Sequence, residues 1–352
     1  MSNRRKLSKT DLAALVGDLL AAGTNVIAPL RFADQGRTAI EYGPVRDPDE
    51  MVLDGPQPVR SLKEAVFPPT DVLFRWRQTK SKIEIEEVPA TFPETVIVGA
   101  RPCDAAALDV LDRVMGWDFR DEMWFGRRQA TAVLSLACTS CDDSCFCTAV
   151  GLSPTATRGA DWFLTPVDGG YEIDVLTPKG EALLERYKAR CPDSDGPATR
   201  AAGVEEKVRA NLDVRPEAVR AWIETHFEDA FWKRASLRCH GCGACAFVCP
   251  TCHCFDIVDE PDGIDHGTRR RNWDACQTNL FTLHASGHNP RKDQAARLRQ
   301  RVLHKFGIYP SRFGEVLCTG CGRCVRVCAA GMDLVAILAE IGRAATEEGG
   351  AR

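Results

Sequence analysis

Two short stretches of sequence decide how this chain of 352 residues is interpreted. Residues 239–250 read CHGCGACAFVCP and residues 318–328 read CTGCGRCVRVC, so each contains the pattern C-x2-C-x2-C-x3-C. This spacing is typical of two [4Fe-4S] clusters, where three cysteines of one run bind one cluster and the fourth binds the other. The pattern therefore predicts a first cluster on Cys239, Cys242, Cys245 and Cys328, and a second on Cys318, Cys321, Cys324 and Cys249.

Zinc is the main alternative for these cysteines, because C-x2-C pairs also build four-thiolate zinc sites. A zinc site needs two pairs, however, and not two runs of four with identical spacing. Glycines at 241, 243, 320 and 322 allow positive φ and let backbone N–H groups approach the sulfurs. One departure exists, since Pro250 follows Cys249 but Ala329 follows Cys328. Proline is not a ligand, so the prediction of two clusters stands.

Composition places the chain among globular proteins, with 44% apolar and 27% charged residues. Its length predicts two or three domains. The net charge of −4 argues against a nucleic-acid binder, and no apolar stretch is long enough to predict a membrane span. Arg4-Arg5 resembles an export signal, but Asp11 and Asp18 interrupt the apolar segment that would have to follow. The bunched cysteines, 17 in all, indicate a cytoplasmic chain with metal or redox chemistry.

Hydrophobic patterns predict an α+β fold: an N-terminal α/β domain over 1–215, then a mainly helical, two-cluster ferredoxin-like domain over 216–352. The second domain carries a long insertion at about 255–312, because the two motifs lie 79 residues apart. In the first domain, strands at 96–100 and 131–137 flank a helix at 104–115, which predicts a βαβ unit with parallel strands. We also predict a hairpin from 162–166 and 171–175, a linker at 191–197, and helices at 179–189, 204–212 and 216–227. Near the N-terminus we predict an N-capped amphipathic helix with Leu12, Leu15, Val16, Leu19 and Leu20 on one face.

Charge is distributed unevenly along the chain. Residues 231–352 hold 17 Lys+Arg and 12 Asp+Glu, a net +5, which leaves −9 for the rest, and they hold 11 of the 17 cysteines. Basic side chains around buried anionic centres would explain this asymmetry, and so would a solvated or partner-facing surface. For each single residue of the basic run Arg297, Arg299, Arg301 and Lys305, we expect a solvated side chain.

A third [4Fe-4S] cluster is predicted in the N-terminal domain. Cys103 and Cys138 follow the two predicted parallel strands, so both lie at their carboxyl ends, where α/β folds build their sites. The next loop brings Cys145 and Cys147 to the same edge, and Cys141 is a possible substitute ligand. The alternative is a set of buried free cysteines, which pack well as small hydrophobic residues. Cys252, Cys254 and Cys276 are left without an assignment.

Further motifs carry a resemblance that covers nearly the whole chain. They are CPTCHCFD (249–256), RNWDACQ (271–277), His-Asn-Pro-Arg (288–291), RLRQRVLHKF (297–306), VGARPCDAAALDVLD (98–112), the pair Arg127-Arg128 and CFCTAVG (145–151). Together they resemble the β subunit of cytosolic sulfhydrogenases, a family that includes the 4Fe-4S dicluster subunit of anaerobic sulfite reductases. The resemblance implies an electron-transfer subunit with no catalytic residues. It would link a flavin subunit, which holds FAD and exchanges hydride with NAD(P)H, to a catalytic subunit, in first place the large and small subunits of a [NiFe] hydrogenase.

Two other functions remain open at this point. One is the dicluster subunit of a complex of the anaerobic sulfite reductase type. The other is a self-contained iron–sulfur flavoprotein with its own flavin in the N-terminal half, which the absence of G-x-G-x-x-G and phosphate-loop motifs disfavours. A zinc-stabilised nucleic-acid module fits neither the charge nor the cysteine spacing.

Overall fold

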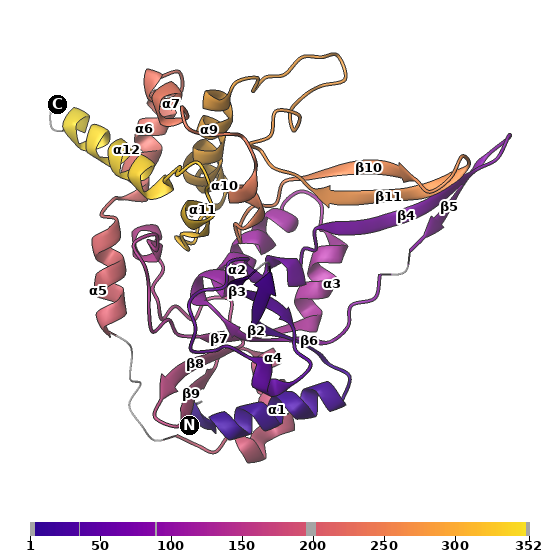
Figure 1. The fold of residues 1–352 in the computed structure, drawn as a ribbon, viewed down its shortest axis with the longest axis vertical. Helices are drawn as coiled ribbons and strands as arrows, with labels where there is room; N and C mark the ends of the chain where they lie inside the picture. The colour runs from indigo at the N-terminus through magenta and orange to yellow at the C-terminus, as the bar shows by residue number, and fades with distance from the viewer. Residues whose placement is uncertain (1–3, 35, 89, 195–201, 350–352) are drawn as a thin grey trace.

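The computed structural model describes residues 4–349 except for 35, 89 and 195–201. It mixes helices and sheets, which confirms the predicted α+β class. Figure 1 shows an α/β part that contains the N-terminus, a group of helices that contains the C-terminus, and a long β arm that projects to one side. None of the described helices is long and apolar enough to cross a membrane.

A seven-stranded sheet forms the α/β part, with strand order β1-β9-β8-β7-β6-β2-β3. The four central strands are parallel, and the outer pairings are antiparallel. Every residue of β6 and β7 is buried, as expected for parallel strands covered on both faces. The strands are β1 (Arg4–Ser8), β2 (Asn25–Asp34), β3 (Arg37–Pro44), β6 (Thr95–Ala100), β7 (Thr131–Leu136), β8 (Trp162–Val167) and β9 (Gly170–Val175).

Four helices cover the two faces of this sheet: α1 (Lys9–Ala21), α2 (Pro102–Met115), α3 (Glu122–Ala130) and α4 (Pro178–Tyr187). Side chains of α1 and α4 pack into one apolar core, and side chains of α2 and α3 into another. The Ser8 side chain caps α1 by accepting a hydrogen bond from the Asp11 N–H. The predicted βαβ unit is confirmed as β6-α2-β7, and the predicted hairpin as β8-β9.

The helical part contains α5 (Ala202–Asn211), α6 (Pro216–Thr225), α7 (Ala230–Ala235), α8 (Ala244–Phe247), α9 (Gln294–Leu303), α10 (Tyr309–Phe313), α11 (Arg323–Arg326) and α12 (Leu334–Gly349). Helices α6, α7, α9 and α12 share a third apolar core around Trp222, Trp232 and Leu338. The helices predicted at 204–212 and 216–227 are confirmed as α5 and α6. In the predicted linker, Cys191 is buried, and Asp193 forms an isolated antiparallel β-bridge with Arg5 of β1. Residues 195–197 of this linker lie outside the described residues.

Short helical turns connect these elements. They are the 3-10 turns η1 (Pro48–Glu50), η2 (Leu62–Ala65), η3 (Cys147–Val150) and η4 (Lys188–Arg190), and the π-helical turn η5 (His304–Ile308). Two of them lie beside the candidate sites described below. Turn η3 begins at one of the predicted ligands, and η2 carries a buried lysine, Lys63.

The β arm joins distant parts of the chain. Strands β4 (Thr70–Gln78) and β5 (Ile83–Glu87) come from the first third, and β10 (Phe255–Pro261) and β11 (His266–Trp273) from the predicted insertion. Their order is β10-β11-β4-β5, with β11 antiparallel to β4 (Figure 1). The sequence pattern did not predict this sheet, because its two hairpins pair with one another, β4 with β11, across about 190–200 residues of chain.

A buried ion-pair network fixes the base of the arm. Asp71 of β4, 4% exposed, accepts hydrogen bonds from Arg127 at 2.6 Å and from Arg271 of β11 at 2.7 Å. Arg271 also pairs with Asp121 and lies over the Phe67 ring. Because an unpaired buried charge costs several kcal/mol, this network holds the arm to the α/β part in one orientation.

Candidate iron–sulfur sites

The cysteines predicted for the first cluster line one cavity of about 340 Å³. Cys239, Cys242 and Cys245 come from the first motif, and Cys328 reaches the same cavity from the end of the second. Leu298, Met332 and Ile337 give the cavity an apolar wall. Cys324 of the second motif lines the cavity too, so the structure brings together five thiols from two segments that lie about 80 residues apart in sequence, and the four predicted ligands are among them.

Polar hydrogen atoms point at the sulfurs of this first group. The side-chain amide of Gln294 donates to the Cys239 Sγ at 3.1 Å, and the Met332 N–H donates to the Cys328 Sγ at 3.3 Å. Gly243 has φ +76°, which starts helix α8 directly from the cysteine loop. Hydrogen bonds of this kind stabilise charge on cluster sulfurs and raise reduction potentials.

The second group surrounds Cys249, the last cysteine of the first motif. Its sulfur interacts electrostatically with Cys318, Cys321 and Cys324 of the second motif. Burial raises the pKa of Cys318 to about 11 and the pKa of Cys324 to about 12. Such thiols stay protonated at neutral pH unless a metal displaces their protons.

Two buried cations lie beside these sulfurs. The Lys305 ammonium is 3.4 Å from the Cys249 Sγ and donates to the Leu317 carbonyl at 2.8 Å. The Arg301 guanidinium is 3.6 Å from the Cys252 Sγ and donates to the Cys245 carbonyl at 3.0 Å. Among the described residues, neither cation forms an ion pair with a carboxylate.

This finding corrects one expectation from the sequence. The prediction of solvated side chains is wrong for Arg297, Arg301 and Lys305, which are all buried, while Arg299 is partly exposed and pairs with Glu228 at 3.0 Å. Arg301 and Lys305 are four residues apart, so both lie on the face of α9 and η5 that turns toward the cysteines. Buried cations without carboxylates require another source of negative charge, and thiolate-bound clusters supply it. The residues present therefore fit anionic clusters.

The third group lies at the carboxyl ends of β6 and β7. Cys103 and Cys138 interact with one another, and Cys138 interacts with both Cys145 and Cys147. Burial raises the pKa of Cys138 to about 11 and the pKa of Cys147 to about 12. Cys141 lies at the edge of this group, with its sulfur 3.9 Å from the Val204 carbonyl of α5. The topology thus places the four predicted cysteines together.

The second and third groups are direct neighbours. Arg323 directly follows Gly322 of the second motif and forms a bidentate ion pair with Asp104. Both N–O distances are 2.6 Å, and both side chains are fully buried. Cys321 and Cys103 both interact electrostatically with this pair. The Gly320 carbonyl accepts a hydrogen bond from the Phe146 N–H at 2.8 Å. The three groups therefore form a continuous series through the protein.

Several residues around these groups were missed by sequence reasoning. The Gln57 amide donates to the Cys103 Sγ at 3.1 Å, and the Lys63 ammonium donates to the Cys252 carbonyl at 2.8 Å. No sequence motif surrounds either residue: Gln57 lies in irregular chain, and Lys63 lies in the short turn η2 before β4. The spacing of Arg301 and Lys305 was enough to predict that they share one helix face, but it did not predict that this face is buried.

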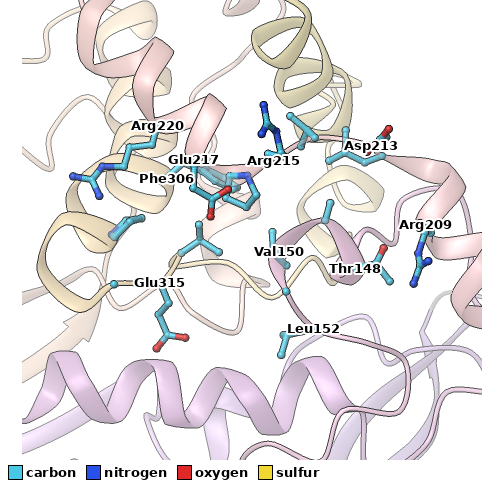
Figure 2. Close-up of a pocket in the computed structure, with 18 of the residues that line it drawn as sticks. Thr148, Val150, Leu152, Arg209, Asp213, Arg215, Glu217, Arg220, Phe306 and Glu315 are labelled. Atoms are coloured by element: carbon cyan, nitrogen blue, oxygen red, sulfur yellow. The ribbon is translucent and has the colours of Figure 1, made fainter. Parts of the chain in front are cut away.

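Two observations concern other kinds of site. Among the described residues, no group of three or more His, Cys, Asp or Glu side chains is arranged to hold a single metal ion. Figure 2 shows a surface cavity of about 700 Å³ beside η3, between α6 and the turn after α10. Its charged lining is mixed, with Arg209, Arg215 and Arg220 set against Glu217 and Glu315, and no cysteine lines it.

Comparison with known proteins agrees with this geometry. Residues 238–332 match the family model of the 4Fe-4S dicluster domain. This chain contains a 4Fe-4S dicluster domain. The domain begins just before Cys239, ends just after Cys328, and includes the hairpin β10-β11.

The dicluster domain lies within a longer similarity. The chain is 28% identical over 325 residues to the β subunit of sulfhydrogenase 2 from Pyrococcus furiosus. The aligned region covers 88% of this chain and 94% of that relative. The resemblance drawn from the motifs is therefore confirmed. No solved structure matches the chain significantly.

Proposed function

We propose that this chain is an electron-transfer subunit of an NAD(P)H-linked oxidoreductase complex and carries three [4Fe-4S] clusters. The observation that carries the proposal is the continuous series of three four-cysteine groups, the second of which contacts both others. The similarity to a protein named as a sulfhydrogenase subunit supports a role inside a complex.

The proposed ligands follow the groups that the fold brings together. The first cluster takes Cys239, Cys242, Cys245 and Cys328, the second takes Cys318, Cys321, Cys324 and Cys249, and the third takes Cys103, Cys138, Cys145 and Cys147. Support for the crossed assignment of the first two is that Cys328 lines the cavity of the first motif while Cys249 lies among cysteines of the second. Support for the third is the shared edge of β6 and β7.

When bound, such clusters supply one-electron redox chemistry. The protein's own residues set the surroundings of each group. Lys305 and Arg301 balance negative charge between the first two groups. In the first group, Gln294 donates a hydrogen bond to the Cys239 Sγ, and the Met332 N–H donates one to the Cys328 Sγ. Arg323 and Asp104 fix the distance between the second and third groups without adding net charge.

We also propose the division of the chain at about residue 215, with domains 1–215 and 216–352 and an insertion at about 255–312. It is supported by the apolar core around α1 and α4, which lies wholly before that position, and by the core around Trp222, most of which follows it although Phe146 and Leu212 also pack there. The β arm crosses the boundary, because β11 of the insertion pairs with β4.

The proposed partners are a flavin subunit that holds FAD and binds NAD(P)H, and a catalytic subunit, in first place a [NiFe] hydrogenase. We place the complex in the cytoplasm, because cysteines bunched at metal-ligand spacing are typical of a reducing compartment. The alternatives are a complex of the anaerobic sulfite reductase type and a self-contained flavoprotein. For the latter, the cavity in Figure 2 offers the space, although no nucleotide-binding motif accompanies it.

Anaerobic purification from the native source tests the proposal. We expect about twelve irons per chain, at four per cubane, no flavin on the isolated chain, and co-purifying flavin and catalytic subunits. A large [NiFe] subunit would support the hydrogenase assignment, and a sirohaem subunit would replace it with sulfite reduction. Stoichiometric flavin on the isolated chain, or a stable monomer without partners, would overturn the proposed role inside a complex. A chain that saturates at about eight irons would remove the third cluster.

A further inference from the structure

The surface around the first group of cysteines carries positive charge. Three segments of chain meet at the cavity that these cysteines line: 230–253, 275–292 and 328–332. None of the three segments contains an aspartate or a glutamate. A patch with a single sign of charge attracts partners of the opposite charge. The lysines and arginines of these segments are Lys233, Arg234, Arg238, Arg291 and Lys292.

Direct contacts hold the three segments together. The Arg238 guanidinium donates to the Gly331 carbonyl at 3.0 Å, which joins the first segment to the third. Gly243 lies against Ala275 and Thr278, so closely that a Cβ on this glycine would be 2.7 Å from the Ala275 Cβ. This contact joins the first segment to the second. The three segments therefore form one continuous surface over the first group.

The loop between β11 and α9 extends this surface (Figure 1). The Asn289 side-chain amide donates to the Asn279 carbonyl at 2.7 Å, so the loop closes on itself. Lys292, at the end of the loop, lines a surface cavity of about 690 Å³ together with Lys233 of α7. Basic side chains of the first and second segments therefore lie near one another.

These basic side chains are available to a partner. Lys233, Arg238 and Lys292 are exposed, and none of them forms an ion pair within the part of the chain that the structure describes. Two acidic residues at the ends of the segments have local roles instead: Asp229 and Asp293 accept the hydrogen bonds that cap α7 and α9. Buried cations already balance the charge of the cysteines, so the exposed ones can meet another molecule.

Apolar side chains lie among these charges. Leu237 is 77% exposed, Leu280 67%, Leu283 47% and Phe247 40%. Cys242, a proposed ligand of the first cluster, is also exposed, so a partner on this surface comes close to the cluster. Separate apolar side chains among cations differ from the continuous apolar core of a permanent interface and fit a protein contact steered by charge. Three of the four are leucines, which offer no ring for the base stacking that single-stranded nucleic acids use.

We propose that this surface docks the acidic face of the one-electron carrier protein that exchanges electrons with the first cluster. The inference rests on the proposed function and adds the chemistry of the partner at this end of the series. One electron passes from the reduced carrier to the oxidised cluster, so the carrier loses one electron and the cluster gains one, and no bond forms or breaks. Because opposite charges guide the encounter, both the affinity and the rate fall as salt is added.

A flavodoxin, a small acidic carrier whose flavin absorbance is distinct from that of iron–sulfur clusters, is the probe for this surface. Calorimetry measures its dissociation constant for the full chain, reconstituted anaerobically, and stopped-flow absorbance measures the rate at which reduced flavodoxin is oxidised by the chain. The key variant is Lys233→Glu with Lys292→Glu. The matched control is Lys9→Glu with Lys80→Glu, which changes the net charge equally at exposed positions on α1 and between β4 and β5.

At low salt, we expect the key variant to raise the dissociation constant and to lower the rate about tenfold, and the control to change either by less than about twofold. The difference between the two should disappear at high salt. The neutral variant Lys233→Gln with Lys292→Gln serves if charge reversal disturbs folding. It should show a smaller change in the same direction, and no change in it would overturn the inference.

Two further outcomes would overturn the docking surface. An equal loss in the control would mean that net charge, and not this surface, attracts the probe. A short single-stranded DNA that binds more tightly than flavodoxin and depends on the same lysines would assign the surface to a nucleic acid. Either outcome leaves the proposed function standing, since iron content and co-purifying subunits test it separately. A chain without partner subunits, in contrast, would overturn the proposed function while the key variant and the control still differ.

Discussion

The two cysteine motifs have identical spacing, but the protein surrounds them very differently. In the second motif, residues 319–323 are all buried, and Arg323 is locked into its ion pair with Asp104. In the first, Arg238, His240 and Cys242 are exposed, and Leu237 beside them is 77% exposed. The local sequence determines which thiols can bind a cluster. The tertiary packing determines which cluster is internal and which one a partner protein can approach.

This difference follows from what each cysteine loop packs against. The Gly320 loop lies on the backbone of Phe146 and Cys147, so the third group covers it. The Gly241 loop lies near the side chain of Gln294 and the carbonyl of Gln277, at the edge of the insertion. We therefore expect the second cluster to act as an internal relay and the first as the contact point for another protein of the complex.

Substitution of the crossed ligands should have the largest effect. Cys249→Ala should cost about four irons and expose Cys318, Cys321 and Cys324 to alkylation, while Cys239, Cys242 and Cys245 stay protected. Cys328→Ala should do the reverse. We also expect Cys249→Ala to destabilise the protein more, because it leaves Lys305 buried without its sulfur. If each variant instead exposes the cysteines of its own motif, the crossed assignment is wrong.

The buried ion pair predicts the next largest difference. Arg323→Met leaves the Asp104 carboxylate buried and unpaired, which should lower the free energy of unfolding by about 3–5 kcal/mol. Arg238→Met removes an exposed side chain that donates to the Gly331 carbonyl, and should cost less than about 1 kcal/mol. Anaerobic denaturant titration of both variants measures the difference.

A double variant controls this comparison. Arg323→Met combined with Asp104→Leu replaces the pair by apolar side chains, and should recover much of the loss. If the double variant is as unstable as Arg323→Met alone, the cost comes from packing and not from an unpaired charge. Equal stability of Arg323→Met and Arg238→Met would contradict the burial of the second motif.

The cysteine-loop glycines give a smaller, matched test. Gly320 and Gly241 both have positive φ, so alanine costs about 1–2 kcal/mol of backbone strain at either position. At Gly320 the new Cβ would also lie 2.5 Å from the Cys147 backbone, whereas at Gly241 its nearest contact is a movable Gln294 side chain at 2.9 Å. Gly320→Ala should therefore cost about 1–3 kcal/mol more. It should also lower occupancy of the third cluster, which Gly241→Ala should leave intact; equal costs would contradict the packing of the two loops.

The comparison also shows what the sequence could predict. Cysteine spacing was enough to predict the two ferredoxin-type groups, and buried apolar runs were enough to predict β6 and β7, whose parallel pairing then brought Cys103 and Cys138 together. The β arm was missed, because its outer strands β5 and β10 have no buried face to impose a hydrophobic pattern. Lys63, Arg301 and Lys305 could not be recognised as buried, since a lysine or arginine is expected at the surface unless the fold supplies its counter-charge.

The smallest expected effect on stability concerns the exposed side of the first motif. Leu237 is 77% exposed and Phe247 is 40% exposed, and both lie close in sequence to cysteines of the first cluster. Leu237→Gln and Phe247→Gln should each change the free energy of unfolding by less than about 0.5 kcal/mol. If a partner protein covers these side chains, the double variant should bind the co-purifying subunits about tenfold more weakly, which corresponds to about 1.4 kcal/mol. Reduction by dithionite should be unchanged, because the clusters themselves are not altered.

Ile264→Gln, at the fully exposed tip of the β arm, is the matched control. Weaker binding in the control alone would move the contact point from the first motif to the arm.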